Sequence, residues 1–208
     1  ACGAIDSTGA VVIPIEYTNS LTSVNNGRLG VQKNASWFYV DMKGQIVSDK
    51  YDRIGNFHQG YASVCLNKLW GAIDLQNRVV VPLEWQGVAP IVDPKLIWVK
   101  KDNLYYLYDG VQKSIRLKQG FANASNFDNE MAYVMSDGKW GIIDPDGKVL
   151  VPCLFEKEED MVLAKQYMLA EDKKNLTEVE ALRVIARFDP DTNMFKITSV
   201  IPDKHWDY

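Results

Sequence analysis

An aspartate recurs along this chain every 33 to 35 residues, and five carboxylates in register could in principle form a ladder of calcium ligands. The five residues are Asp6, Asp41, Asp74, Asp109 and Asp144. A calcium loop draws several oxygen ligands from one short segment, and Asp144-Pro145-Asp146 alone offers two carboxylates in one turn. We therefore expect these side chains to cap turns by accepting hydrogen bonds from their own downstream amides, and we predict no metal site.

The residues needed for acid–base or nucleophilic catalysis are scarce. The chain has two histidines, His58 and His205, and no Gly-x-Ser-x-Gly, phosphate loop, dinucleotide fingerprint or His-Glu-x-x-His motif. A carboxylate pair of the glycosidase kind stays open, because the separation of such a pair is set in space. Three glutamates nevertheless recur near repeat ends, which favours a structural role: Glu16, Glu84 and Glu156. We predict no catalytic residue, no cofactor and no enzyme activity.

Aromatic side chains crowd one stretch in the middle of the chain, and planar rings can contact a protein partner or stack on a sugar. The candidate binding residues are Trp85, Trp98, Tyr105, Tyr106 and Tyr108. We predict an unknown protein as their partner, with a glycan as the alternative. The competing interpretation places each ring in the core, because a large aromatic buries about 150 to 250 Å².

A repeated structural unit must position these side chains, because the same sequence pattern recurs around each aspartate. The anchor residue, three positions before the aspartate, is Gly3, Phe38, Gly71, Tyr106 or Gly141. A valine lies seven positions before the anchor in four copies, at Val31, Val64, Val99 and Val134. Three copies share a proline eleven positions after the anchor and an aromatic fourteen after it: Pro14, Pro82, Pro152, Tyr17, Trp85 and Phe155. Such a period indicates an array of supersecondary units.

Each unit is expected to be a three-stranded β-meander. Apolar residues alternate or cluster over 61–66 and 69–74, which is strand length, and Asn67-Lys68 between them reads as a hairpin connection. A third strand over 148–151 ends at Pro152, which cannot donate to a ladder.

Adjacent units must cover one another, because one small meander cannot bury a face alone. We expect Trp70 and Trp140 to be apolar plugs between meanders, with Gly71 and Gly141 letting a ring or a facing backbone approach closely. The predicted fold is all-β, a repeat protein of about five three-stranded units. An open array is expected, and a propeller-like closure is the alternative.

The repeated phrase resembles the WG repeat family of bacterial proteins. Its pattern is a Trp-Gly pair, a short apolar strand, Asp, a Gly turn and a Val/Ile-rich strand ending at Pro, and Trp70-Gly71 and Trp140-Gly141 match the naming dipeptide. Cys2-Gly3 lacks the Trp, Trp37-Phe38 lacks the Gly, and Tyr105-Tyr106 lacks both. The resemblance covers about residues 1–156 and implies a noncatalytic repeat module that mediates protein interaction or serves as a structural scaffold.

Composition bounds the partners and the compartment. The 208 residues carry a net charge of −4, with isolated cation pairs at Lys100-Lys101 and Lys173-Lys174 and no basic stripe, which disfavours nucleic acid. No apolar run approaches the roughly 20 residues of a membrane span. The chain lacks an initiator Met and starts inside a repeat. We therefore expect a piece of a longer or processed protein, with export to the periplasm or cell surface as one interpretation.

The C-terminal segment, 157–208, is expected to cap the array. Alternation over 182–188, the turn residues of 189–193 and a partner strand over 195–201 predict a β-hairpin. A short helix is the alternative, because Thr177-Glu178-Val179-Glu180 has the form of a capping box. The tail at 205–208 is expected to belong to the cap, with a partner-binding peptide as its second interpretation.

Overall fold

A computed structural model describes residues 1–20 and 23–157 and the strands at 184–189 and 194–200, and each element of this described part is a β-strand. Two compact units, Ala1–Gly120 and Phe121–Tyr208, divide the chain, and each is described by itself. The boundary between the units lies between the fourth and fifth copies of the repeat. The predicted division at residue 156 stays a prediction, as does the choice between an open and a closed array.

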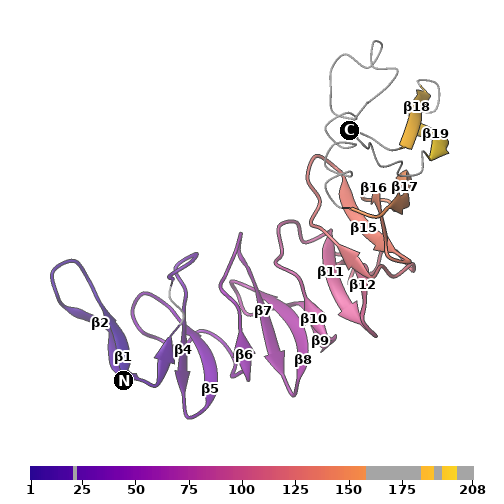
Figure 1. Cartoon of the computed structure of the whole chain (residues 1–208). Helices are drawn as coiled ribbons and strands as arrows, with labels where there is room; N and C mark the ends of the chain where they lie inside the picture. Colours follow the sequence, from indigo (N-terminus) through magenta and orange to yellow (C-terminus); the bar gives the residue numbers. More distant parts are fainter. Residues whose placement is uncertain (21–22, 158–183, 190–193, 201–208) are drawn as a thin grey trace, which may run out of the picture. The chain divides into compact units, whose positions relative to one another are not determined.

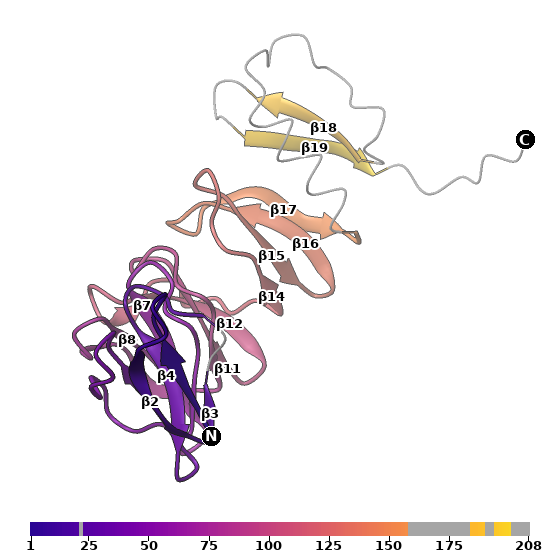
Figure 2. The ribbon, with the colours of Figure 1, turned by 90° about the vertical axis from the view of Figure 1, so that its left-hand side faces the viewer.

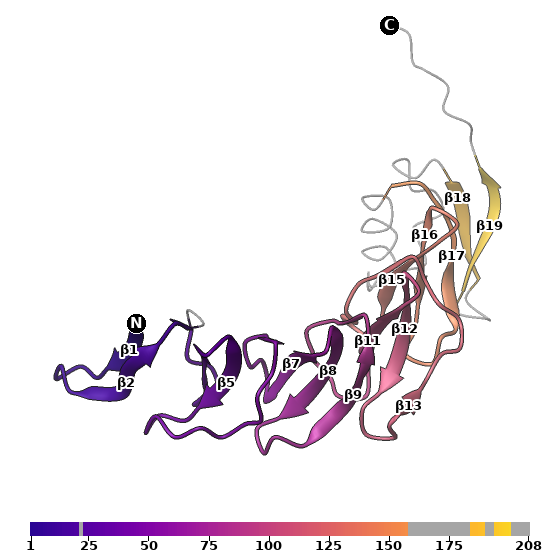
Figure 3. The ribbon, with the colours of Figure 1, turned by 90° about the horizontal axis from the view of Figure 1, so that it is seen from below.

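The first unit is a series of small antiparallel sheets, one for each copy of the repeat (Figures 1 and 3). Each sheet is a meander in which consecutive strands are neighbours. The sheets contain β1 (Cys2–Ile5) and β2 (Val11–Tyr17); β3 (Asn19–Ser20), β4 (Leu29–Lys33) and β5 (Ser36–Val40); β6 (Arg53–Ile54), β7 (Tyr61–Leu66), β8 (Leu69–Asp74) and β9 (Val79–Trp85); and β10 (Gly87–Val88), β11 (Ile97–Lys101), β12 (Leu104–Asp109) and β13 (Ser114–Ile115).

The second unit holds the fifth copy and the C-terminal hairpin (Figure 2). The repeat sheet contains β14 (Asn123–Ala124), β15 (Ala132–Ser136), β16 (Lys139–Ile143) and β17 (Val149–Phe155). The hairpin is formed by β18 (Val184–Asp189) and β19 (Met194–Val200), which confirms the predicted strand pair. The capping box of the alternative helix and the tail at 205–208 lie outside the described residues.

Type I′ turns join the two long strands in four of the five repeat meanders. At the predicted hairpin connection Asn67 and Lys68 have φ angles of 53° and 67°, both left-handed as this turn requires. The equivalent turns are Asn34-Ala35, Asp102-Asn103 and Asp137-Gly138. Since the backbone twist of this turn matches that of the flanking strands, one local geometry sets the strand register in four copies.

The register places the anchor residue opposite the recurring valine in each of these pairs. The partners are Phe38 and Val31, Gly71 and Val64, Tyr106 and Val99, and Gly141 and Val134. All four valines are fully buried. The recurring valine is thus a core position that the period alone identifies.

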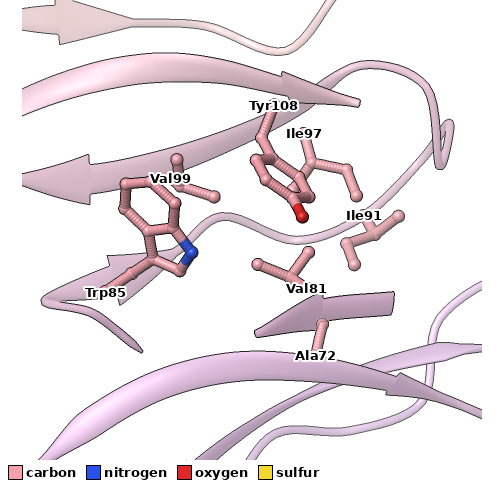
Figure 4. Close-up of a cluster of buried hydrophobic side chains, with 7 residues drawn as sticks. All are labelled: Ala72, Val81, Trp85, Ile91, Ile97, Val99 and Tyr108. Carbon is pink, nitrogen blue, oxygen red and sulfur yellow. The ribbon is translucent and has the colours of Figure 1, made fainter. Parts of the chain in front are cut away.

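The apolar clusters of the first unit lie between successive sheets, as predicted for meanders that cannot bury a face alone. The first joins β1–β2 to β3–β5 through Ile13, Tyr17, Leu29, Val31 and Val40. The second joins β3–β5 to β6–β9 through Tyr39, Tyr51, Phe57, Ala62, Val64 and Ile73. The third joins β6–β9 to β10–β13 through Ala72, Val81, Trp85, Ile91, Ile97, Val99 and Tyr108 (Figure 4). Each fully buried aliphatic or aromatic side chain contributes about 1.5 to 3 kcal/mol.

The anchor glycine makes room for the backbone of the third strand. A Cβ at Gly71 would lie 2.5 Å from the carbonyl oxygen of Val81, and one at Gly141 would lie 2.6 Å from that of Val151. The ladder is irregular here, because Trp70 pairs with Trp85 while Ala72 pairs with Val81, so that β9 bulges over the glycine. A facing backbone, not a ring, is the group that approaches.

Copies with an aromatic anchor lack a full third strand, which differs from the predicted uniform unit. After β5 the return segment makes isolated bridges from Val40 to Ile46 and from Trp37 to Tyr51. After β12 the third strand shrinks to the two residues of β13. Four of the sheets also gain a two-residue strand on the first edge, β3, β6, β10 or β14, which no sequence pattern indicated.

The tryptophans of the two Trp-Gly pairs are not buried equally. Trp140 is buried with 8% of its surface exposed, as expected for a plug between meanders. Trp70 is only half-buried, so the prediction that it is a fully buried plug was wrong. The fully buried positions of its sheet are Val64, Ala72, Ile73 and Val81, whereas Trp70 lies close to the hairpin turn at Asn67-Lys68.

Candidate interaction surface

The recurring aspartates cap the turns that lead into the third strands, as predicted. The Asp74 carboxylate accepts the amides of Gln76 and Arg78, both at 2.9 Å. The same pair of bonds, from the second and fourth residues onward, forms at Asp6, Asp41 and Asp144. Asp109 accepts the amides of Val111 and Gln112 instead. These oxygens are therefore engaged by backbone donors.

Hydrogen bonding lowers the pKa of three capping carboxyls, those of Asp6, Asp41 and Asp74. The Thr8 hydroxyl and amide hold the pKa of Asp6 below its ordinary value. Burial raises the pKa of Asp74, but hydrogen bonds from Arg78 and Gln76 outweigh it and leave that pKa lowered. The Arg78 guanidinium lies 2.7 Å from the second carboxylate oxygen of Asp74. Among the described residues no group of three or more His, Cys, Asp and Glu side chains could hold a metal ion.

The side chains suggested for acid–base chemistry lie on the surface. Glu16, Glu84, Glu156 and His58 are exposed. Glu16 pairs with the Lys33 ammonium at 2.9 Å, and both side chains are more than 40% exposed. An ion pair this exposed contributes little to stability.

Three of the five predicted binding aromatics are buried in the core, which corrects their assignment to a contact surface. Trp98 is 1%, Tyr108 3% and Trp85 6% exposed. Trp85 packs edge-on against Tyr108 with ring centroids 5.9 Å apart in the third cluster (Figure 4). Rings this buried cannot touch a partner without opening the fold.

The other two predicted aromatics, Tyr105 and Tyr106, are half-buried. The Lys100 ammonium lies 5.2 Å from the Tyr105 ring centroid, within cation–π range. Tyr106 packs against the third cluster and also meets Gly120, where an added Cβ would lie 2.9 Å from the ring. Both rings are thus partly exposed, and they differ in their neighbours: Tyr105 lies beside the Lys100 ammonium, whereas Tyr106 fills the space beside its own return segment.

Tyr105 belongs to a row of half-buried aromatics that we call the hairpin-edge aromatics: Trp37, Trp70 and Tyr105. Each directly precedes an anchor and lies within three residues of a type I′ turn. The tips of the β4–β5, β7–β8 and β11–β12 hairpins point to the same side of the first unit (Figure 1). Because packed sheets lie about 10 Å apart, the rings recur at about one sheet spacing along that side.

Sequence reasoning did not single out this row, although a signal was present. The position before the anchor is aromatic in four of five copies, with Cys2 as the exception. A repeat array displays equivalent residues along one edge, so this recurrence predicts a row.

A shallow hollow lies between the second and third sheets of the first unit. It holds about 150 Å³, open solvent included, and its lining includes Arg28, Tyr39, Ser48, Asp74 and Asn77. Small-molecule pockets span about 300 to 1,000 Å³, so this hollow is too small for such a ligand.

Stacked antiparallel meanders that share their cores define a β-repeat protein. The model of the WG containing repeat matches five times, over residues 3–37, 37–70, 70–105, 120–140 and 140–157. The chain belongs to the WG containing repeat family. Residues after 157 lie outside the matches.

No curated protein matches this chain, whereas several solved structures align with part of it. A eukaryotic initiation factor has 13% identity and a TM-score of 0.45 over 68% of this chain and 45% of its own. The N-terminal domain of Nup159 has 13% identity and a TM-score of 0.43, over 83% and 51%. Kluyveromyces lactis Hsv2p has 11% identity and a TM-score of 0.39, over 64% and 49%.

The chain spans about half the length of these three structures. At such identities and TM-scores the likeness carries no functional argument. In the part of the chain that the structure describes, no helix is long and apolar enough to cross a membrane.

Proposed function

We propose that the chain is a noncatalytic binding module that holds a protein partner against the hairpin-edge aromatics Trp37, Trp70 and Tyr105. The observation that carries this proposal is their recurrence as half-buried rings at one position of three successive copies. The recurring carboxylates are engaged in turns, which supports a structural over a catalytic use.

Aromatic rings suit this task because they supply large contact area at low entropic cost and are enriched at protein interfaces. The hairpins that carry the rings are pinned by type I′ turns and by buried valines. A row held in this way is preorganised, so binding need not order it first.

The test is affinity capture with a triple variant, Trp37→Gln, Trp70→Gln and Tyr105→Gln. The matched control is Val11→Gln, Ile46→Gln and Val79→Gln, which alters three apolar residues, 43 to 57% exposed, that follow the aspartate-capped turns. A partner retained by wild type and the control but lost by the folded aromatic variant supports the proposal. Equal retention by both variants contradicts it.

A glycan is the second candidate ligand, favoured by the polar residues beside two of the rings. Gln32 is the cross-strand partner of Trp37, and Lys100 is that of Tyr105. Planar rings with polar neighbours can stack on a sugar face and bond its hydroxyls. Titrating a broad sugar panel while recording tryptophan fluorescence tests this alternative. Quenching that disappears in the triple variant would favour it over a protein partner.

A further inference from the structure

The hairpin-edge aromatics share a chemical feature beyond their rings. Each carries one hydrogen-bond donor, the indole N–H of Trp37 and of Trp70 and the hydroxyl of Tyr105. In the part of the chain that the structure describes, none of these donors has a hydrogen-bond partner, and Trp85 Nε1 is the only buried side-chain nitrogen or oxygen there that lacks one. The three donors are therefore open to solvent and can reach an acceptor on a bound molecule.

The hairpin ends that carry these rings are basic, although the chain as a whole has a net charge of −4. The segments that run from the cross-strand partner of each ring to the ring itself are 32–37, 65–70 and 100–105. Each segment has one net positive charge, and the charged residues are Lys33, Lys68, Lys100, Lys101 and Asp102. The row therefore complements an acidic chain.

Two carboxylates from neighbouring segments lie beside these hairpin ends. Glu16 pairs with Lys33 at 2.9 Å, and the Asp52 carboxylate accepts the Asn67 amide at 2.7 Å. The first pair is exposed and contributes little, so Lys33 can exchange it for a carboxylate of a partner. The second carboxylate is engaged by a backbone donor.

The spacing of the rings selects among extended partners. Successive rings recur at about one sheet spacing, roughly 10 Å. A β-strand returns side chains to one face at about 6.6 and 13 Å, which does not match. A polyproline II helix has about 3 residues per turn and a rise of about 3.1 Å, so every third residue faces one side at about 9.3 Å. An α-helix matches at every seventh residue, about 10.5 Å, but its carbonyls are bonded within the helix.

We propose that the hairpin-edge aromatics bind an acidic, proline-rich segment in the polyproline II conformation, with every third residue of the segment against one ring. This inference rests on the proposed function and names the chemistry of its partner. The carbonyls of such a segment have no internal hydrogen bonds and can accept from the indole and hydroxyl donors. Its acidic side chains lie within reach of the four lysines. Both surfaces are ordered before they meet, which lowers the entropic cost of binding.

The probe is a dye-labelled peptide of four Pro-Pro-Glu triplets, titrated with the full chain while fluorescence anisotropy is recorded. A peptide of four Ala-Ala-Glu triplets keeps the charge without the conformation, and one of four Pro-Pro-Lys triplets reverses the charge. We expect each control peptide to bind at least about tenfold more weakly. The proposal is overturned if the Pro-Pro-Glu peptide does not bind saturably, or if either control peptide binds equally well.

A variant that keeps the rings tests the donors. Trp37→Phe, Trp70→Phe and Tyr105→Phe together remove every donor of the row, and this variant should bind the Pro-Pro-Glu peptide at least about threefold more weakly. The matched control of the capture experiment should bind it as wild type does. Unchanged binding by the folded phenylalanine variant, or equal weakening in the control, overturns the proposal.

Failure of this inference can be told from failure of the proposed function. If the Pro-Pro-Glu peptide does not bind but the folded glutamine variant still loses its captured protein, the polyproline inference alone is overturned. If the glutamine variant captures that protein as wild type does, the proposed function is overturned and this inference with it.

Discussion

The β6–β9 copy and the β10–β13 copy differ at one decisive position, the anchor. In the first, Gly71 lets the third strand bulge across with a carbonyl 2.5 Å from where a Cβ would stand. In the second, Tyr106 occupies that space, the third strand shrinks to β13, and Gly120 passes beside the ring instead. The glycine that permits close packing thus lies on the anchor strand in the first copy, at Gly71, and on the return segment in the second, at Gly120.

This contrast explains why the anchor glycine and the proline eleven residues later occur together. The prolines at 14, 82 and 152 lie in the bulged strands of the glycine-anchored copies. A bulge leaves backbone groups outside the ladder, so the missing amide of proline is tolerated there. In copies without the bulge, no facing backbone requires a glycine anchor, and no bulged strand is present to accommodate a proline.

Gly71→Ala tests this comparison with the largest expected loss of stability. The added Cβ would meet the Val81 carbonyl and the Leu83 side chain, at 2.5 and 2.9 Å. We expect the free energy of unfolding to fall by about 3 to 5 kcal/mol, measured by urea denaturation. Gly87→Ala is the control, because its Cβ would lie an ordinary 3.6 Å from Lys100 and should cost under about 1 kcal/mol. Equal losses would contradict the role of the bulge.

The reverse change, Tyr106→Gly, sharpens the comparison. It removes a half-buried ring from the third cluster without providing a bulged third strand. We expect a loss of about 2 to 4 kcal/mol in the same assay, because a void replaces the ring. Tyr106→Phe is the control and should stay within about 1 kcal/mol. A neutral Tyr106→Gly would mean that the return segment can rebuild as a strand.

The capping aspartates give a pH-dependent test. The pKa of Asp74 is lower in the folded than in the unfolded chain, so its contribution is present above the unfolded value of about 3.9 and is lost as pH falls through the folded value. We expect the free energy of unfolding to decline over that acid range. Asp74→Asn, which keeps one acceptor oxygen, should flatten the decline and cost about 1 kcal/mol at pH 7. An unchanged pH profile in the variant would contradict this.

The smallest expected effect concerns Asn77, which takes the left-handed turn position that is glycine at 9, 44 and 147. It accepts from the Tyr51 hydroxyl at 3.3 Å and donates to Asp49 at 3.0 Å, both in the preceding copy. Asn77→Gly relieves the backbone but loses these bonds, so we expect a net change within about 1 kcal/mol. A double-mutant cycle with Tyr51→Phe should show coupling of about 0.5 to 1 kcal/mol. Zero coupling would contradict a stabilising hydrogen bond between Tyr51 and Asn77.

Sequence reasoning recovered the elements that recur and missed those that depend on a neighbour. The period predicted the strands, the capping by Asp74 and the family, because these are local and repeated. It did not predict the two-residue edge strands, since pairs such as Arg53–Ile54 carry no alternation to detect. The loss of the third strand after Phe38 and Tyr106 was also missed, although the absent prolines signalled it.

The candidate site was harder to predict, because burial is set between copies. Trp85, Trp98 and Tyr108 look alike in sequence to Tyr105, yet they are buried while Tyr105 is half-exposed. Which ring is covered depends on the neighbouring sheet and not on local pattern. Tyr51 shows the same limit, since its buried place opposite Trp37 became clear only from the pairing.

Because each apolar cluster is shared by two sheets, stability in the first unit is held in nearest-neighbour couplings and not within single copies. Opening the β3–β5 or the β6–β9 sheet breaks two of these couplings. The unit should therefore behave like a one-dimensional chain, in which a change in one sheet is felt first by its immediate neighbours.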